Sequence, residues 1–289
     1  MTSVAKQAPR KANRRPKWQK VSFGGYVGLV LMMIVSAFPF YWMFVVASNG
    51  SDAVSKIPPP LLPGPRFFTV IANVYKVVDF NVALLNTAIV GLCVAVAQVF
   101  FSALAGFAFA KLDFKGRRGL IVFVIGTMML PSQLGIIPLY MMIANWHWVN
   151  TLYALIVPAL VTAFGVFWMR QIIDAQIPNE MLEAASIDGA GVLRVYWSIV
   201  LPVIAQSGFV LGLFSFLASW NDFLWPNLVL QSPNMYTAQV AVNQLKANYV
   251  VDYALNLGGA FLATAPLLLL FVFVGRRLVS GVMDGAVKG

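Results

Sequence analysis

The sequence contains little cysteine, histidine or charge, and each shortage excludes a class of protein. Of its 289 residues, one is a cysteine, Cys93, and one is a histidine, His147. These counts exclude a disulfide framework, a cage of cysteine thiolates around a metal, and a histidine relay. Charged residues make up 10% of the chain, whereas soluble domains carry about 25%. Because hydrophobic residues make up 60%, we expect most of the chain to lie in lipid. Cys93 is expected to pack as a small apolar residue in a helix.

Long uncharged stretches indicate membrane-spanning helices, because each reaches the roughly 20 residues that cross a ~30 Å hydrocarbon core. The longest, Gly119–Met169, is long enough for two crossings and contains a polar and aromatic turn at Asn145–Thr151. The sequence therefore predicts an all-α integral membrane protein with six transmembrane helices. Their predicted ranges are Phe23–Ala47, Leu84–Ala110, Leu120–Ile143, Leu152–Met169, Leu201–Leu224 and Leu257–Gly275.

The basic residues are concentrated on one side of these helices. Sixteen of the 20 Lys and Arg residues lie before the first helix, after the sixth, or in the loops that follow the second and fourth. Because Lys and Arg are enriched in cytoplasmic loops, both termini are expected to be cytoplasmic. The chain divides into a disordered basic arm at 1–22, a six-helix transmembrane domain at 23–276 and a cytoplasmic tail at 277–289. The net charge of +10 indicates contact with anionic membrane lipid rather than nucleic acid, because it is spread over membrane-flanking loops.

The loop at about 174–200 predicts a short amphipathic helix that docks onto another protein. Pro178 suits a first helical turn, and Glu180 and Glu183 lie near its positive end. Gly189 offers a left-handed stop. The expected apolar side consists of Met181, Leu182, Ala185 and Ile187. The alternative, a helix lying on anionic lipid, is disfavoured by the four acidic residues of this loop.

This loop resembles the signature of a known family. Glu183-Ala184-Ala185, then Gly189, then Ile199-Val200-Leu201-Pro202 resembles the EAA motif of ABC-importer permeases. Other segments resemble the carbohydrate branch of that family, and most of all its smaller maltose-permease subunits. These segments are Asn86-Thr87-Ala88, Leu130-Pro131-Ser132-Gln133, Ile137-Pro138-Leu139-Tyr140, Asn150-Thr151, Ile187-Asp188-Gly189-Ala190, Ser219-Trp220-Asn221-Asp222-Phe223-Leu224-Trp225-Pro226 and Gly285-Ala286-Val287-Lys288-Gly289.

The tail departs from the family pattern. Gly281-Val282-Met283-Asp284 stands where relatives usually carry a Gly-Leu-Thr-Ala run. Whether Asp284 alters the tail's contacts with the ATPases is left open.

The resemblance implies a coupling role for the loop. The residues that would couple the membrane helices to an ATPase are Glu180, Glu183, Ala184, Ala185, Asp188, Gly189, Ala190, Leu201 and Pro202. The implied partners are a second homologous permease, two ATPase subunits and an extracellular solute-binding protein, in a bacterial or archaeal inner membrane. The chain itself is expected to have no enzymatic activity and to bind no cofactor or metal, with ATP and Mg used by the ATPase. The sequence agrees, because it contains no G-x-x-x-x-G-K-[ST] phosphate loop.

Neutral polar and aromatic residues of the third and fifth predicted helices are candidates for lining a cargo path. They are Gln133, Ser215, Phe216, Ser219, Trp220 and Asn221. For the residues near helix ends, interfacial anchoring or helix contact is an open alternative. Because no Arg or Lys cluster accompanies them, the predicted cargo is a neutral sugar, and the resemblance implies a di- or oligosaccharide.

Two other functions are left open. One is an ABC permease for another organic solute such as glycerol phosphate. The other is an ion-coupled secondary carrier, which the absence of charged residues near the bilayer midplane disfavours.

The outer loops complete the expectations. Ser48–Val82 contains five prolines and is predicted to be stiff and extended. Pro226–Asn256 is predicted to be a polar loop, and the resemblance implies that it reaches toward the binding protein. Asn86 is expected to be the N-cap of the second helix.

Overall fold

The computed structural model describes residues 22–246 and 252–286, with side chains described as far as Gly275. Within these residues the elements are helices joined by loops. Almost all of the predicted basic arm and the last three residues of the tail lie outside the described residues, and so does the side chain of Asp284.

The helical elements follow one another along the whole described chain. They are α1 (Phe23–Asn49), η2 (Ser51–Val54), α2 (Phe67–Val77), α3 (Phe80–Lys111), α4 (Arg117–Thr127), η3 (Ser132–Gly135), α5 (Ile136–Asn145), α6 (Tyr153–Ile156), η4 (Val157–Ala159), α7 (Ala163–Gln176), α8 (Asn179–Ile187), α9 (Val192–Val195), η5 (Tyr196–Val200), α10 (Leu201–Asn221), α11 (Leu224–Val229), η6 (Pro233–Met235), α12 (Ala238–Gln244) and α13 (Tyr253–Ala286).

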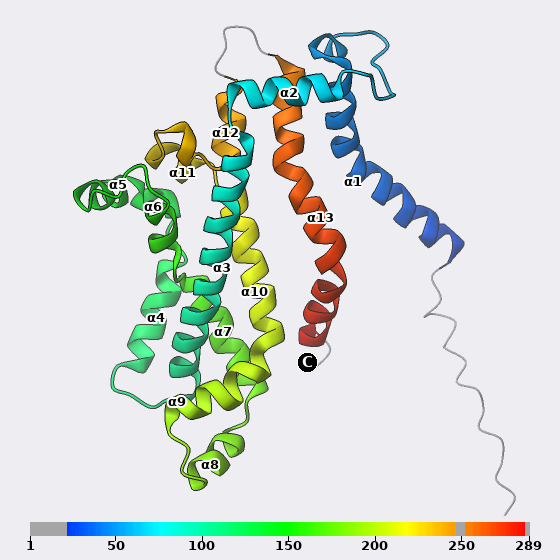
Figure 1. Ribbon diagram of the computed structural model, residues 1–289. Helices are drawn as coiled ribbons and strands as arrows, with labels where there is room; N and C mark the ends of the chain where they lie inside the picture. Colours follow the sequence, from blue (N-terminus) through cyan, green and yellow to red (C-terminus); the bar gives the residue numbers. More distant parts are fainter. Residues whose placement is uncertain (1–21, 247–251, 287–289) are drawn as a thin grey trace, which may run out of the picture.

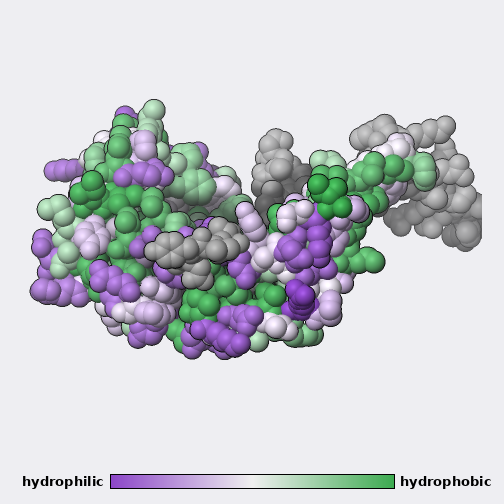
Figure 2. Space-filling view, turned by 90° about the horizontal axis from the view of Figure 1, so that it is seen from above, coloured by the Kyte–Doolittle hydropathy of each residue, from purple (hydrophilic) through white to green (hydrophobic). Residues whose placement is uncertain are grey.

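The helices form a body around α3, with two long helices beside it. The long helices α3 and α10 run through the body and pack against α7, whereas α13 and α1 lie to one side (Figure 1). The first and last helices meet through aromatic rings, since the centroids of Phe44 and Phe261 are 5.6 Å apart. Helix α2 lies across one end of the molecule, and α8 and α9 lie at the opposite end. Figure 2 looks down on the α2 end, where hydrophilic side chains are spread among hydrophobic ones.

Four helices are long and apolar enough to cross a membrane, and they match four of the predicted spans. These are Phe23–Asn49, Phe80–Lys111, Val192–Asn221 and Tyr253–Gly275. The other two predicted spans are each a pair of shorter helices. The pair Arg117–Thr127 and Ser132–Asn145 is bent by 96°, and the pair Tyr153–Ala159 and Ala163–Gln176 by 41°.

The two breaks have local causes. Pro131 stands in the first break and lacks the N–H that would continue the helix. Thr162 stands in the second, where its extended backbone and its Oγ1, which accepts from Gly165 N at 3.2 Å, start α7 as a new helix. The predicted spans at Leu120–Ile143 and Leu152–Met169 therefore each correspond to a bent pair of helices rather than to one continuous helix.

The loops at the α2 end also differ from their prediction. Within Ser48–Val82, residues 67–77 form helix α2, and Val70 and Val74 are buried. The polar loop contains α12, whose Ala238 and Ala241 are buried in an apolar cluster with α2, α3 and α13. Apolar residues spaced three and four apart inside these loops form helices that cover the bundle end.

Asn86 and Cys93 also lie in positions that the sequence did not predict. Asn86 lies inside α3 rather than at its start, and its amide donates to the carbonyl oxygens of Asn234 and Tyr236 at 3.0 and 3.1 Å. The N-cap of α3 is Asp79, whose carboxylate accepts from Val82 N. Cys93 is exposed on the surface of α3.

Close packing of α3 against α7 requires a glycine. A Cβ atom at Gly106 would lie 2.8 Å from the backbone nitrogen of Arg170 and 2.8 Å from Met169 Cβ. Such distances are shorter than van der Waals contact, so the two backbones approach each other only because this position has no side chain.

We expect Gly106→Ala to destabilise the protein by roughly 1–3 kcal/mol, because the added methyl group forces α3 and α7 apart. The matched control is Gly126→Ala in α4, where a Cβ atom meets nothing within 4 Å. This control should be neutral or slightly stabilising, since alanine favours helix more than glycine does. Thermal unfolding in detergent measures both variants, and equal melting temperatures would contradict the close-packing argument.

Candidate functional site

Helix α8 is held at the end of the molecule by one buried lysine. Lys111, the last residue of α3, has a side chain that is 6% exposed. Its Nζ lies 3.1 Å from Asn179 Oδ1 at the start of α8 and 3.5 Å from Asp174 Oδ1 in α7. Because the ammonium group of this α3 residue contacts both α7 and α8, the start of α8 is fixed relative to α3 and α7.

The C-terminal end of α8 is closed by a left-handed glycine. Gly189 has φ +75°. Its N–H donates to Ser186 O at 3.0 Å, and the N–H of Ala190 donates to Ala185 O at 2.9 Å. These two bonds form a Schellman motif, which confirms the left-handed stop expected at Gly189. At the other end, Pro178 occupies the N-cap position, one residue before the predicted first turn.

The two faces of α8 have different partners. Leu182 and Ala185 pack into an apolar cluster that contains Tyr196, Ile173 and Met169. Met181 is exposed and Ile187 is 87% exposed. The predicted apolar side is therefore only partly buried, because Leu182 and Ala185 face this cluster whereas Met181 and Ile187 stay exposed.

The exposed face continues into α9, where Val192 and Leu193 are also exposed. Acidic residues accompany these apolar side chains on α8. They are Glu180, Glu183 and, at its C-cap, Asp188. The small Ala184 is exposed among them, so a partner's backbone can approach closely. This face suits a protein partner with an apolar cleft and basic groups at its rim.

A π-helical segment links this face to the membrane. Residues 196–200 form η5, and α10 follows without a break, with Leu201 as its first residue and Pro202 in its first turn. Because the helical backbone is continuous here, Pro202 leaves a backbone carbonyl of the preceding turn without its usual N–H donor, directly after the π-helical segment. The buried ring of Tyr196 lies 5.9 Å from that of Phe107, so the segment is packed against α3.

A second feature is a partly open pocket of about 530 Å³ between the helices, which is called the polar cavity here because hydroxyl, amide and carboxyl groups line part of it. It is lined by Thr87, Val90, Val94, Gln98, Ser132, Leu139, Leu155, Pro158, Ala159, Thr162, Ser215, Ala218, Ser219, Asp222, Trp225, Pro226 and Thr237. Gln98 is buried, and its Oε1 accepts from Ser215 Oγ at 2.8 Å and from Thr162 Oγ1 at 3.3 Å. One amide thus joins α3, α10 and the start of α7.

Two further residues give this cavity its hydrogen-bonding character. Thr237 is buried, and its Oγ1 has no hydrogen-bond partner among the described residues. Asp222 supplies the one carboxyl group of the lining. Burial raises the pKa of the Asp222 carboxyl, and the backbone N–H groups of Trp225, Leu224 and Phe223 oppose that rise. The cavity therefore offers hydroxyl, amide and carboxyl groups with no lysine or arginine in its lining.

The structure distributes the predicted path residues over different surroundings. Ser215 and Ser219 line the polar cavity. Phe216 lines a separate apolar groove between α3 and α10. Trp220 is buried, and its Nε1 donates to Ala263 O in α13 at 3.1 Å. Asn221 is exposed and donates to Leu217 O, and Gln133 is exposed beside Ser132.

Sequence reasoning missed the cavity residues on α3 and near α12. Gln98 lies in the middle of an apolar span, and a polar residue at that depth was a usable signal. Thr87 and Thr237 gave no such signal, because their meeting depends on how α12 folds back onto α3. Within the residues that the structure describes, no three His, Cys, Asp or Glu side chains gather as metal ligands would.

The chain is similar to known transport proteins. The family described as "Binding-protein-dependent transport system inner membrane component" matches residues 98–282. The arabinooligosaccharides transport system permease protein AraQ of Halalkalibacterium halodurans is 29% identical over 266 residues, which cover 91% of this chain and 95% of AraQ. The sn-glycerol-3-phosphate transport system permease protein UgpE of Yersinia enterocolitica is 28% identical, covering 90% of this chain and 95% of UgpE.

A solved structure has the same fold. A chain of a bacterial ABC transporter involved in the import of the acidic polysaccharide alginate superposes with a TM-score of 0.76. The match covers 88% of this chain and 94% of the other at 19% sequence identity, so it supports the fold alone.

We expect Lys111→Met to loosen α8, because the substitution removes the hydrogen bond to Asn179 and the ion pair with Asp174. Hydrogen bonds to charged groups contribute about 1.5–3 kcal/mol, so amide exchange across residues 179–187 should speed up roughly tenfold or more. The matched control is Lys115→Met, which removes an exposed lysine of the adjacent loop. Equal exchange in the two variants would show that Lys111 does not anchor α8.

Proposed function

The chain belongs to the family of inner-membrane components of binding-protein-dependent transport systems, and we propose that it is the permease subunit of an ATP-driven sugar importer. In this role it forms half of the translocation pathway and couples that half to a separate ATPase. The chain's contribution is binding and movement rather than covalent chemistry.

The observation that carries this proposal is the geometry of α8 and α9. Their outer face is apolar and acidic, while their inner face is joined to the membrane helices by Leu182, Ala185 and the Lys111 contact. We propose that the outer face, with Glu180, Glu183, Ala184, Asp188 and the Gly189 turn, docks into the ATPase. A displacement of the ATPase then moves α8 as a unit with α7 and α10.

Orientation follows from the same docking. The described end of α13 points toward the α8 end of the molecule, opposite α2 (Figure 1). We propose that the α8 end faces the cytoplasm and the α2 end faces outward. Both termini are then cytoplasmic, in the inner membrane of a bacterium or archaeon. At the outer end, α2, α11 and α12 form the surface that a solute-binding protein would contact.

The exposed side of α1 supports a second permease. Only Val45, Val46, Ala47 and Ser48, near the end of this helix, are buried, and its preceding turns have exposed apolar side chains. A helix of 27 residues with so few internal contacts suits packing against another membrane protein as well as lipid. We propose that a homologous permease covers it and completes the pathway.

The polar cavity supports a neutral cargo. Hydroxyl and amide groups bind sugar hydroxyls, and no lysine or arginine in its lining would hold a phosphate. We propose a di- or oligosaccharide that passes Ser215 and Ser219, with Gln98 and Asp222 as further contacts. Glycerol phosphate is the alternative, and the similarity to UgpE favours it.

The test is uptake by vesicles that contain the chain with its partner permease, ATPase subunits and binding protein. We expect uptake of a labelled oligosaccharide to require ATP and to continue when the proton and sodium gradients are collapsed. The spans support this because, within the described side chains, none of the membrane helices places an acid or base at its centre.

The possible results of this uptake experiment test the transport mechanism and the identity of the cargo separately. Uptake that follows an ion gradient and ignores ATP would overturn the assignment as an ABC permease. ATP-driven uptake of glycerol phosphate, with the oligosaccharide excluded, would overturn only the cargo.

Coupling is tested by Gly189→Val. A β-branched residue in left-handed geometry costs about 1–2 kcal/mol, so the turn after α8 should shift while the membrane helices stay folded. We expect assembly to survive and uptake to fall, with ATPase activity no longer stimulated by cargo. The matched control is Gly191→Val, where φ is −70° and a Cβ atom meets nothing within 4 Å. Normal uptake in Gly189→Val, or equal loss in both variants, would contradict the coupling role.

A further inference from the structure

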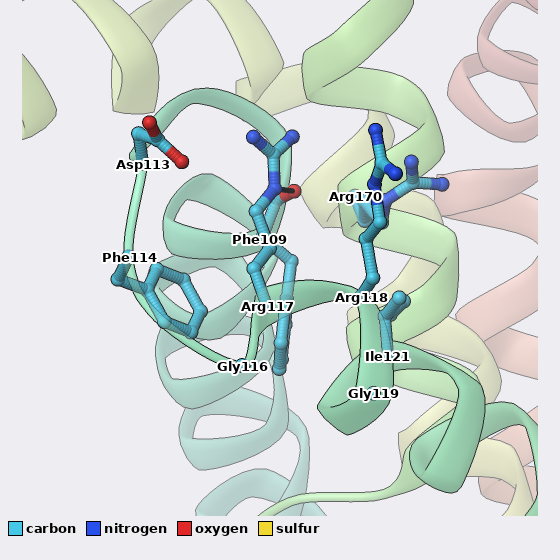
Figure 3. A pocket seen from close by; sticks show the side chains of 9 residues that line it. All are labelled: Phe109, Asp113, Phe114, Gly116, Arg117, Arg118, Gly119, Ile121 and Arg170. Carbon is cyan, nitrogen blue, oxygen red and sulfur yellow. Dashed lines mark hydrogen bonds between the residues drawn. The ribbon is translucent and has the colours of Figure 1, made fainter.

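A second cavity lies at the α8 end of the molecule, away from the polar cavity. It has a volume of about 570 Å³ and opens between the loop after α3, the first turn of α4, and α7. Its lining combines three arginines, one acid, two aromatic rings and apolar or small residues: Phe109, Asp113, Phe114, Gly116, Arg117, Arg118, Gly119, Ile121 and Arg170. In Figure 3 the guanidinium groups of Arg118 and Arg170 extend toward one end of the cavity, and Asp113 lies at the other.

The positive charges of this cavity are not balanced by the protein. None of the three arginines has a carboxylate within 4.0 Å in the part of the chain that the structure describes, where the ion pairs are Lys56–Asp52 and Lys111–Asp174. Two guanidinium groups that share one cavity repel each other, and the repulsion is stronger beside apolar walls than in water. The arrangement is stable when an anion lies between them.

The arginines also differ in how much of their hydrogen-bonding capacity is used. Arg117 donates from Nε and Nη2 to the carbonyl oxygens of Phe109 and Ala110, both at 2.9 Å, so it closes the end of α3. Arg170 donates from Nη1 to Gln171, but its buried Nε has no partner among the described residues. Arg118 makes no hydrogen bond to those residues. Donors for an anion therefore remain on Arg118 and Arg170.

The start of α4 adds to the same positive field. Gly116, at the N-cap, has φ +86°, and no side chain accepts a hydrogen bond from the first amides of the helix. Gly116 and Gly119 both line the cavity, so the positive end of α4 faces it. A helix N-terminus by itself does not indicate a ligand. Here, however, the N-terminus of α4 faces the same cavity as the unpaired guanidinium groups of Arg118 and Arg170.

The apolar surroundings indicate which anion fits. Helix α4 has no buried residue: its Ile121 lines the cavity, and the next two residues, Val122 and Phe123, are mostly exposed. A free phosphate would contact the arginines but would leave the exposed apolar surface of α4 uncovered. A phospholipid uses both, because its acyl chains can lie along α4 while its phosphate reaches the arginines.

We propose that this cavity binds the headgroup of an anionic membrane phospholipid, held by Arg118 and Arg170. The inference rests on the membrane placement proposed above, but it assigns a ligand that transport does not require. The bound lipid links α4 to α7, which otherwise meet beside the loop after α3.

The experiment measures lipid retention by the full transporter complex. The complex is purified in nanodiscs of phosphatidylcholine with phosphatidylglycerol, and native mass spectrometry counts the phosphatidylglycerol that stays bound. We expect selective retention, and Arg118→Gln should weaken it roughly tenfold because one charge-assisted contact is lost. Arg118 makes no contact that folding needs, so this variant should assemble normally. Lys115→Gln is the matched control, since Lys115 lies in the same loop but outside the cavity lining.

Each other outcome overturns the proposal. Equal weakening by Arg118→Gln and Lys115→Gln would show general attraction to a charged surface. Displacement of the lipid by inorganic phosphate at the same concentration would show a free-phosphate site. Crosslinking of the Lys115→Cys variant, which keeps both arginines, to another subunit, without retained lipid, would show that an acidic protein segment occupies the cavity. Because retention is measured without transport, loss of lipid binding leaves the permease assignment standing.

Discussion

The close approach of α3 to α7 and α10 is the constraint on which the rest of the structure depends. Gly106 allows the α3 and α7 backbones to meet, and Gln98 joins α3 to Ser215 and Thr162 through one amide. In water the hydrophobic effect would drive these helices together, but in lipid it does not. Close packing and interhelical hydrogen bonds therefore provide the stabilisation here. A residue larger than glycine at 106 would move both the α8 anchor and the polar cavity.

The anchor and the cavity lie on the same rigid helix. Gln98 and Lys111 are separated by 13 residues, which corresponds to about 20 Å along α3. Rotation or tilt of α3 therefore changes the cavity and the position of α8 together. The proposed coupling requires no chain of small side-chain rearrangements between the two ends, since one helix carries both.

The sequence predicted the elements whose causes are local. Uncharged stretches of roughly 20 residues or more predicted the four continuous spans. Gly189, which follows an acidic segment, predicted the end of α8. The sequence did not predict the 96° bend beside Pro131, because prolines also stand in helices that remain straight enough to span, as Pro39 does in α1. Asn86 was misread as a cap, since its real acceptors, Asn234 and Tyr236, lie nearly 150 residues away and are close only in the folded chain.

The pairing of α1 with α13 has a consequence for synthesis. Helix α1 precedes α13 by about 200 residues, yet among the described residues α13 is its main packing partner, with α2 contributing through Phe67. Until α13 has been made, α1 lacks this contact and is stabilised in lipid by its own backbone hydrogen bonds and its apolar side chains. A chain that is truncated before residue 253 would leave α1 without this partner. The contact between α1 and α13 can therefore form only after the intervening helices have been made.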